Sequence, residues 1–260
     1  MMPLDKKILD THENFLKKQI FFTFTRWPQY DLLFNDIKYL AKKIKKNHRA
    51  LLLERTNLYG GISLFAPFFK KNTITSVDCV SKTLLKRGSY NSKNLQSKKI
   101  IKIKSNYQFD YRKIKLKKGQ FDLIIIPNLM HHISDPEKII HQSYELLKKN
   151  GTIYIFEPLF REVHQYPEDY FRFTPYGLRF LLKKKNFKND KYKTIGGPFT
   201  SAMYFWDQAI QYLKGPLKTK RQKWFKDEFK KLVILEKKFK KNLIRKNTFS
   251  PTAFSITAKK

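Results

Sequence analysis

The chain has 260 residues, and its 55 Lys and Arg against 21 Asp and Glu give a formal net charge of +34. This length suits one α/β domain with additions, or two small domains, and it buries a substantial core without disulfides. A hydrophobic fraction of 41% excludes a disordered polycation. The single cysteine, Cys79, excludes an internal disulfide and a cysteine-cluster metal site. No apolar run reaches the roughly 18–20 residues of a membrane span, and no signal-peptide segment opens the chain, so we expect a cytoplasmic protein.

The positive charge comes mainly from lysine, with 45 Lys against 10 Arg. A charge of this size invites a nucleic-acid partner. Nucleic-acid-binding surfaces, however, favour arginine, whose planar fork binds phosphate and guanine. The chain is also rich in Ile, Asn, Phe and Tyr, which have A/T-rich codons, so genome composition alone can account for many surface lysines. An anionic membrane surface and a nucleic acid both stay open as partners, with nucleic acid the less favoured.

Residues 1–47 are predicted to form a helical lead-in that precedes a domain over residues 48–260. Apolar residues recur there at spacings of four, three and four, which is one face of a helix: Leu33, Ile37, Leu40 and Ile44. Four lysines between residues 42 and 46 crowd the last turn, where cations complement the helix dipole.

From residue 49 onward, short apolar runs alternate with helical stretches, a pattern typical of a parallel sheet covered on both faces. Five buried strands are predicted, over residues 50–53, 74–77, 100–103, 121–126 and 152–156.

The clearest intervening helix is predicted to begin at Asp135-Pro136 and to end at the basic residues before Gly151. Another helix is predicted to open at Thr174-Pro175, with Leu178, Phe180, Leu181 and Leu182 as its apolar set. Residues 192–195 read as a strand, residues 200–246 as a helical insert, and residues 253–257 as a last strand.

One stretch carries a family resemblance. It runs FDLIIIPNLMHHISDP over residues 121–136 and is followed by a helix ending LLKKNG and a strand ending FEP. This stretch resembles the fourth strand, loop, helix and fifth strand of class I S-adenosylmethionine (SAM)-dependent methyltransferases. The next segment, YPEDYFRFTPYGL over residues 166–178, looks like a subgroup associated with cell-surface polysaccharide synthesis.

The resemblance implies an α/β fold with a doubly wound, seven-stranded, mostly parallel sheet, which is the Rossmann-like methyltransferase fold. The last strand would be antiparallel, the helical lead-in would precede the sheet, and the helical insert would stand before the last strand. SAM would lie across the carboxyl ends of the first four strands, where open α/β sheets bind ligands.

The turn after the first strand should approach the methionine part of SAM. In the family this turn has an acid followed by three alternating glycines. Glu54 matches the acid and Gly60 the last glycine, with Gly61 beside it, whereas Thr56 and Leu58 stand where glycines are expected. A β-carbon at those two positions crowds the ligand and disfavours positive φ. An ordinary turn that binds no cofactor is the alternative reading.

Two acids are predicted to hold the adenosine. Asp78 ends the second strand 24 residues after Glu54, close to the spacing of a ribose-binding acid. The family pattern puts Asp110 at the adenine amino group, with the backbone of Tyr111 nearby. A strand-end turn and a solvated loop are the competing roles for these two acids.

The loop after the fourth strand should form the active-site side of the cofactor site. The resemblance puts Asn128 and Leu129 against the cofactor. His131 and His132 are the candidate catalytic residues, because a histidine near neutral pKa suits removal of a proton from a hydroxyl. A structural role for the pair is the alternative. We expect no metal site, since His164 lies far away in sequence and no two histidines share one helix face.

The residues after the fifth strand should line the acceptor side. Arg172 would hold a phosphate or carboxylate, and Tyr170 would stack on a sugar or base. Glu157 and His164 complete this candidate set. The alternative is that the segment forms a buried latch.

The insert ends in a basic helix. Residues 217–246 contain 13 Lys and Arg and 3 Asp and Glu, with an apolar face that includes Phe225, Phe229 and Phe239. A basic amphipathic helix lies on an anionic membrane, and this one would make the protein peripheral there. A lid over the cleft and a homodimer contact are the alternatives.

The preferred function is a SAM-dependent methyltransferase that acts on a small-molecule, glycan or glycolipid acceptor at oxygen. Methyl transfer from a sulfonium needs alignment more than acid–base catalysis, so the lack of an evident acid–base pair is no objection. A cofactor-free scaffold with the same fold and an RNA methyltransferase are the alternatives.

Overall fold

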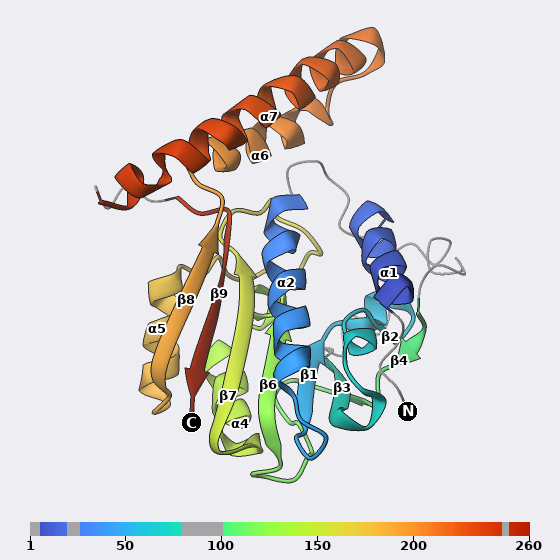
Figure 1. Cartoon of the computed structure of the whole chain (residues 1–260), viewed down its shortest axis with the longest axis vertical. Coiled ribbons are helices and arrows are strands. Elements are labelled where there is room, and N and C mark those ends of the chain that lie inside the picture. The colour runs from blue at the N-terminus through green and yellow to red at the C-terminus, as the bar shows by residue number, and fades with distance from the viewer. Residues whose placement is uncertain (1–5, 20–26, 80–100, 246–249) are drawn as a thin grey trace.

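The structure is a computed structural model that describes residues 6–19, 27–79, 101–245 and 250–260. Its centre is a seven-stranded sheet in the order β5-β3-β1-β6-β7-β9-β8 (Figure 1). The strands are β1 (Ala50–Glu54), β3 (Ile74–Cys79), β5 (Tyr107–Phe109), β6 (Phe121–Pro127), β7 (Leu147–Pro158), β8 (Lys188–Ile195) and β9 (Ala253–Lys259). Strand β9 runs antiparallel between β7 and β8, and the pairs on the β5 side of β7 are all parallel. The predicted fold class is confirmed.

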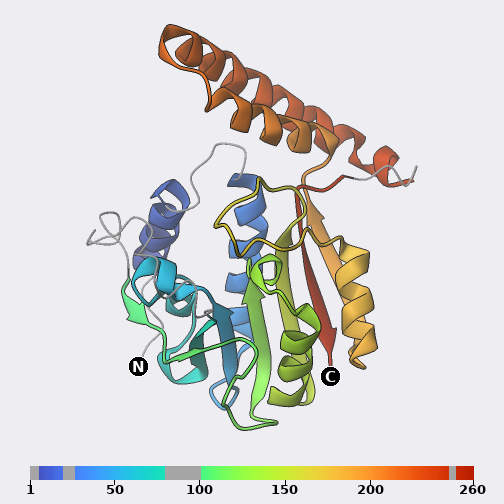
Figure 2. The ribbon, with the colours of Figure 1, turned by 180° about the vertical axis from the view of Figure 1, so that it is seen from behind.

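The apolar strands are buried because helices cover both faces of the sheet (Figures 1 and 2). On one face, Leu52 and Ile125 pack under α1 (Lys6–Gln19) and α2 (Trp27–Lys43). On the other face, Leu51 and Ile124 pack under α4 (Pro136–Leu146) and α5 (Pro175–Lys184). Side chains alternate between the faces along each strand, so a continuous apolar run serves two core layers.

The helix starts on the α4 and α5 face follow their predicted caps. The Asp135 carboxylate accepts from the Lys138 N–H, and the Thr174 hydroxyl accepts from the Gly177 N–H. The predicted end of α4 is wrong, because the helix stops at Leu146 and the chain enters β7 directly. Phe180 does not belong to the buried face of α5, since 66% of it is exposed.

The third predicted strand is also misplaced. The short β4 (Ile103–Lys104) pairs with β2 (Ile62–Ser63) outside the main sheet. The main sheet instead takes β5, whose partly exposed sequence Tyr-Gln-Phe carries no apolar run. Residue 100, where the prediction began, lies outside the described residues.

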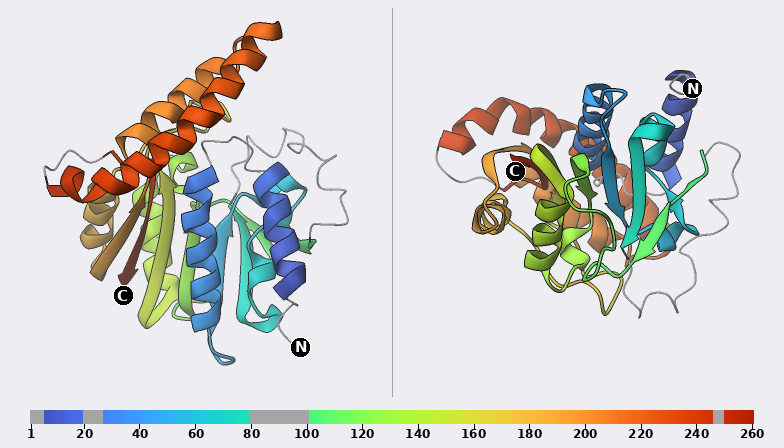
Figure 3. Two further views of the ribbon diagram at one scale, coloured as in Figure 1. Left: turned by 45° about the horizontal axis from the view of Figure 1, so that its top comes forward. Right: turned by 90° about the horizontal axis from the view of Figure 1, so that it is seen from below.

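The lead-in and the insert lie at different places on the sheet. Both lead-in helices lie on one face, with Leu33, Ile37, Leu40 and Ile44 buried as the spacing predicts. The insert consists of α6 (Pro198–Ile210) and α7 (Gly215–Arg245), which form a hairpin across the end of the sheet where the parallel strands finish (Figures 1 and 3). No helix in the described ranges is long and apolar enough to cross a membrane.

Candidate functional site

Three acids meet at the carboxyl edge of the sheet. In the strand register Glu54 lies opposite Asp78, Asp78 lies opposite Gln108, and Asp110 comes directly after β5. The edge therefore presents one acid from each of three adjacent strands, as the resemblance implies. The contacts of each acid decide what it can still bind.

The turn after β1 accommodates the two residues that replace glycines. It begins as a 3₁₀ helix, η1 (Thr56–Tyr59), and positive φ is confined to Gly60 and Gly61, at 63° and 78°. The Thr56 hydroxyl lies within hydrogen-bond distance of the Ser105 hydroxyl, at 3.1 Å. A β-carbon on either glycine would meet nothing within 4 Å, so the turn borders open space. The side chain of Leu58 lies outside the described residues.

Glu54 is buried beneath this turn. Its Oε1 accepts from the hydroxyls of Ser63 and Ser76, at 2.5 and 3.1 Å. Burial raises the pKa of its carboxyl to about 7, because water no longer solvates the charged form.

Asp78 and Asp110 both have partners within the protein. Asp78 Oδ1 accepts from the Thr56 N–H at 2.9 Å, and burial raises the pKa of this carboxyl. Asp110 forms a bidentate ion pair with Arg112, in which Arg112 Nε and Nη2 donate to Asp110 Oδ1 and Oδ2 at 2.8 and 2.5 Å. Tyr111 is buried, and its hydroxyl bonds Ser134. Adenosine binding by these residues stays a prediction.

Arg55 is the residue of this edge that the sequence reading missed. Its residue surface is only 8% exposed, and none of its three guanidinium nitrogens has a hydrogen-bond partner. Its ion pair to Glu168 Oε2 is long, at 3.8 Å. Burial lowers the pKa of the guanidinium. A buried cation with free donors is costly unless a ligand pairs with it.

Arg55 borders an open pocket at the carboxyl ends of β1 and β6, whose empty volume of about 470 Å³ includes open solvent. Two further polar atoms at this pocket are buried without hydrogen-bond partners, the side-chain oxygens of Asn128 and Gln165. Asn128 has a φ of 57°, a left-handed turn conformation that asparagine tolerates, at the end of β6. The full lining is Glu54, Arg55, Tyr59, Leu64, Phe65, Pro127, Asn128, His132 and Gln165.

Glu157 stands behind the loop that follows β6. Its Oε1 accepts from the backbone N–H groups of Leu129 and Met130, at 2.9 and 2.7 Å, and its Oε2 lies 2.6 Å from His131 Nδ1. Because Glu157 is fully buried, it positions the loop and does not line an acceptor surface. Leu129 is likewise packed in the core and is not among the residues that line the pocket.

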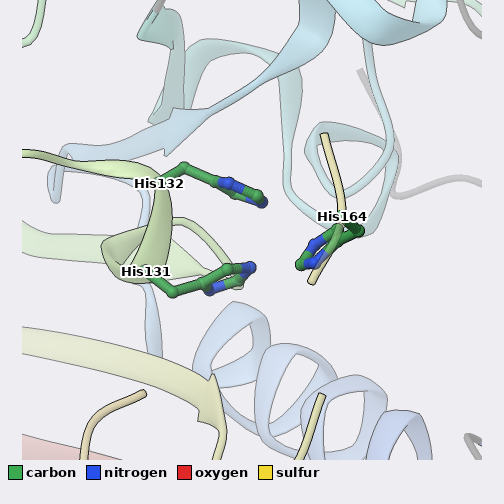
Figure 4. A group of neighbouring side chains, drawn as sticks. All are labelled: His131, His132 and His164. Atoms are coloured by element: carbon green, nitrogen blue, oxygen red, sulfur yellow. The ribbon is translucent and has the colours of Figure 1, made fainter. Parts of the chain in front are cut away.

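Three histidines gather beside the pocket (Figure 4). The ring centroids of His131 and His132 are 3.9 Å apart, and His164 lies 5.3 and 4.9 Å from them. Burial lowers the pKa of His132 strongly and that of His164 to about 3, so both rings are neutral. The sequence did not predict this cluster, because His164 is distant in sequence from His131 and His132. The loop that carries His164 returns to the edge of the sheet and brings the three rings together.

The segment after His164 is held by hydrogen bonds within its own loop but is only partly buried. Arg172 donates to both oxygens of Asp169, at 2.5 and 2.7 Å, and to the carbonyls of Arg161 and Glu162. The Tyr170 N–H donates to the His131 carbonyl at 2.9 Å, while 46% of Tyr170 is exposed. Arg172 therefore holds its own loop, and substrate binding by Tyr170 and Arg172 stays a prediction.

Comparisons with known proteins agree with this geometry. Residues 60–155 match the family model of a methyltransferase domain. A search of curated proteins finds no match. The fold is similar to that of a SAM-dependent methyltransferase from Archaeoglobus fulgidus, with a TM-score of 0.50 and 15% identity over 88% of this chain and 94% of that one.

Two other solved structures extend the comparison. The 4+2 cyclase SpnF has a TM-score of 0.50 and 14% identity, over 90% of this chain and 82% of that one. Phosphoethanolamine N-methyltransferase 2 from Haemonchus contortus, in complex with S-adenosyl-L-methionine, has a TM-score of 0.47 and 15% identity, over 96% of this chain and 60% of that one. The two structures with a TM-score of 0.50 show the fold. The domain match supports the predicted enzyme, a SAM-dependent methyltransferase with S-adenosyl-L-methionine as its cofactor.

The pocket residues fit the amino-acid end of that cofactor. The guanidinium of Arg55, whose nitrogens have no hydrogen-bond partner, suits a carboxylate, and the side-chain oxygens of Asn128 and Gln165, which also lack such partners, suit an ammonium group. Gly60 and Gly61 leave the space beside the turn open. Arg55 and Gln165 were missed because neither is a glycine of the turn pattern; the only sequence signal was an arginine directly after Glu54 at the strand end.

Proposed function

We propose that this protein transfers a methyl group from SAM to a hydroxyl oxygen of a small or saccharide-linked acceptor. The observation that carries the proposal is the set of buried polar groups without hydrogen-bond partners around one pocket: the Arg55 guanidinium and the side-chain oxygens of Asn128 and Gln165. Native proteins rarely leave such groups unpaired, so a polar ligand is the physical reason for them.

The chain's own residues would hold and orient the reactants. When bound, SAM supplies an electrophilic methyl group on a sulfonium, and the protein's task is alignment. Arg55 would fix the carboxylate of the amino-acid end, and Asp78 the ribose hydroxyls. The apolar side chains of Leu64 and Phe65 would exclude water from the pocket.

His132 would face the acceptor hydroxyl. Its Nδ1 lies 2.5 Å from the Glu168 carbonyl, which can only accept, so Nδ1 carries the hydrogen. The neutral ring then offers a lone pair at Nε2 to a hydroxyl group. A saccharide-linked acceptor is supported by the resemblance of residues 166–178 to methyltransferases of polysaccharide synthesis.

Titration with S-adenosylhomocysteine, the product of SAM, tests the cofactor half of the proposal. We expect one-to-one binding in the micromolar range. A binding-deficient but folded protein would favour the scaffold alternative.

We further propose that the α6–α7 hairpin holds the protein at an anionic membrane surface. Large apolar side chains are exposed on it, among them Trp206 at 46%, Tyr212 at 87% and Trp224 at 46%. The ring centroids of Trp206 and Trp224 are 6.1 Å apart, so the two rings form one patch. Lysines surround this patch along α7. Aromatic side chains with flanking lysines are typical of interfacial helices.

Vesicle sedimentation measures this membrane contact. The protein should pellet with vesicles of phosphatidylcholine and phosphatidylserine, and it should be released by salt because the attraction is electrostatic. Trp206→Ser with Trp224→Ser should weaken pelleting at least tenfold. Phe180→Ser, which removes an exposed aromatic from α5, should leave it unchanged. Equal pelleting with phosphatidylcholine alone, or none with either lipid, refutes the membrane contact.

A further inference from the structure

We propose that His131, His132 and His164 form a binding site for a divalent zinc ion. Each ring offers one nitrogen, and these three nitrogens lie within 4.8 Å of one another. Figure 4 shows the rings turned toward a common space, with two coming from the loop after β6 and the third from a separate loop. The inference goes beyond methyl transfer, because zinc binding needs neither SAM nor an acceptor. Zinc takes the lone pair at His132 Nε2, so in the zinc-bound protein this nitrogen no longer accepts from an acceptor hydroxyl.

The hydrogen bonds of the three rings determine which nitrogen of each ring can bind the zinc ion. His132 Nδ1 lies 2.5 Å from the Glu168 carbonyl, and His164 Nδ1 lies 3.0 Å from the Glu162 carbonyl. Carbonyl oxygens only accept, so both Nδ1 atoms carry hydrogen and both neutral rings keep a lone pair at Nε2. His131 Nδ1 is bound to the Glu157 carboxylate in the same way.

Buried nitrogens without partners point to a missing ligand. Nε2 of His131 and Nε2 of His164 are both buried and have no hydrogen-bond partner. His131 is fully buried, so water does not satisfy its ring from the surface. Metal-binding histidines almost always donate their second ring nitrogen to a carboxylate or a carbonyl, which is the arrangement of all three rings here.

Charges around the cluster leave room for a cation. Glu157 lies behind His131, and Asp169 Oδ2 lies 3.2 Å from His164 Nδ1. In addition to burial, the positive charges of Arg55 and Arg161 lower the pKa of His132 and His164 respectively, and each arginine also faces a carboxylate, Arg55 toward Glu168 at 3.8 Å and Arg161 toward Glu162 at 3.6 Å.

Three imidazoles favour zinc over magnesium or calcium, which prefer oxygen ligands. A tetrahedral zinc ion with Zn–N bonds of about 2.0–2.1 Å separates its ligand nitrogens by roughly 3.3 Å. Binding must therefore draw the widest pair together by up to about 1.5 Å. The loop of His164 carries no regular secondary structure, so it is the part that can move. The fourth coordination position would be open, as in zinc sites that bind a substrate or water.

Metal titration of the tag-free protein tests the site. We expect one Zn²⁺ per chain by calorimetry and by elemental analysis after dialysis, and visible absorption bands when Co²⁺ replaces it. Mg²⁺ should not bind. His164→Ala should weaken zinc binding at least tenfold, and circular dichroism should show that it folds, since His164 lies on a loop and is only partly buried.

A matched control removes histidines elsewhere. The double variant His48→Ala with His141→Ala should bind zinc as the original chain does, because neither residue belongs to the cluster. The proposal is overturned if the original chain holds no stoichiometric zinc at micromolar concentration. It is also overturned if zinc binding survives His164→Ala, or if it is lost in the double variant.

Discussion

Replacing Arg55 with methionine should weaken the binding of S-adenosylhomocysteine by about 10- to 100-fold. A hydrogen-bonded pair between a guanidinium and a carboxylate contributes about 1.5–3 kcal/mol, which corresponds to this loss. In the structure no guanidinium nitrogen of Arg55 is hydrogen-bonded, so methionine removes the cofactor contact without breaking a hydrogen bond of the fold, and of the fold's ion pairs it removes the long one to Glu168, at 3.8 Å. Titration calorimetry of the two proteins measures the difference.

Two further variants separate charge from shape. Arg55→Lys keeps the charge but loses the planar fork, so its affinity should fall between those of the original chain and Arg55→Met. Arg179→Met removes an arginine that pairs with Asp190 at the far end of the domain from the pocket, and it should bind as the original chain does. Wild-type affinity in Arg55→Met would contradict the carboxylate role.

Replacing Glu157 with alanine should lower the free energy of unfolding by about 3–5 kcal/mol, the usual cost of breaking a buried charged network. The carboxylate accepts from two backbone N–H groups and meets the ring of His131, and it is fully buried. Alanine leaves these groups unpaired and opens a cavity beside them. Urea unfolding followed by tryptophan fluorescence measures the change.

Two control variants, Glu157→Gln and a surface variant, give the unfolding free energies with which that of Glu157→Ala is compared. The glutamine keeps one acceptor oxygen but turns its amide hydrogens toward the His131 N–H, so it should lose part of the stability. Glu137→Ala removes an exposed acid that pairs with Lys184, and its unfolding free energy should match that of the original chain. An unchanged unfolding free energy in Glu157→Ala would remove Glu157 as the anchor of the loop after β6.

Apolar patterning predicted the sheet well where burial dominates. Strand β1, strand β6 and the second half of β7, over residues 152–156, are largely apolar and mostly buried, and their positions follow from the sequence. The third strand of the main sheet, β5, was not predicted because it is short and partly exposed. It lies at the edge of the sheet, where it pairs with β3 alone. The end of α4 was misjudged because the lysines before Gly151 suit a helix end but here lie in a strand.

The site was predictable where strand ends bring residues together. Glu54 and Asp78 lie in register because adjacent parallel strands finish at one edge. The histidine cluster and the pocket lining by Gln165 depend instead on how a loop without regular structure folds back, which no periodicity encodes. Arg55 was not predicted for a related reason. Only its burial without hydrogen-bond partners, which the structure shows, marks it as a ligand-binding group.

Calorimetric titration with S-adenosylhomocysteine tests most directly whether the carboxyl edge still accepts the cofactor beside a turn in which Thr56 and Leu58 replace glycines. We expect one molecule bound per chain with a dissociation constant of about 1–100 μM. In Asp78→Asn the affinity should be at least tenfold lower. No heat at millimolar ligand, from a chain shown to be folded by circular dichroism, would contradict it and leave a methyltransferase fold without its cofactor.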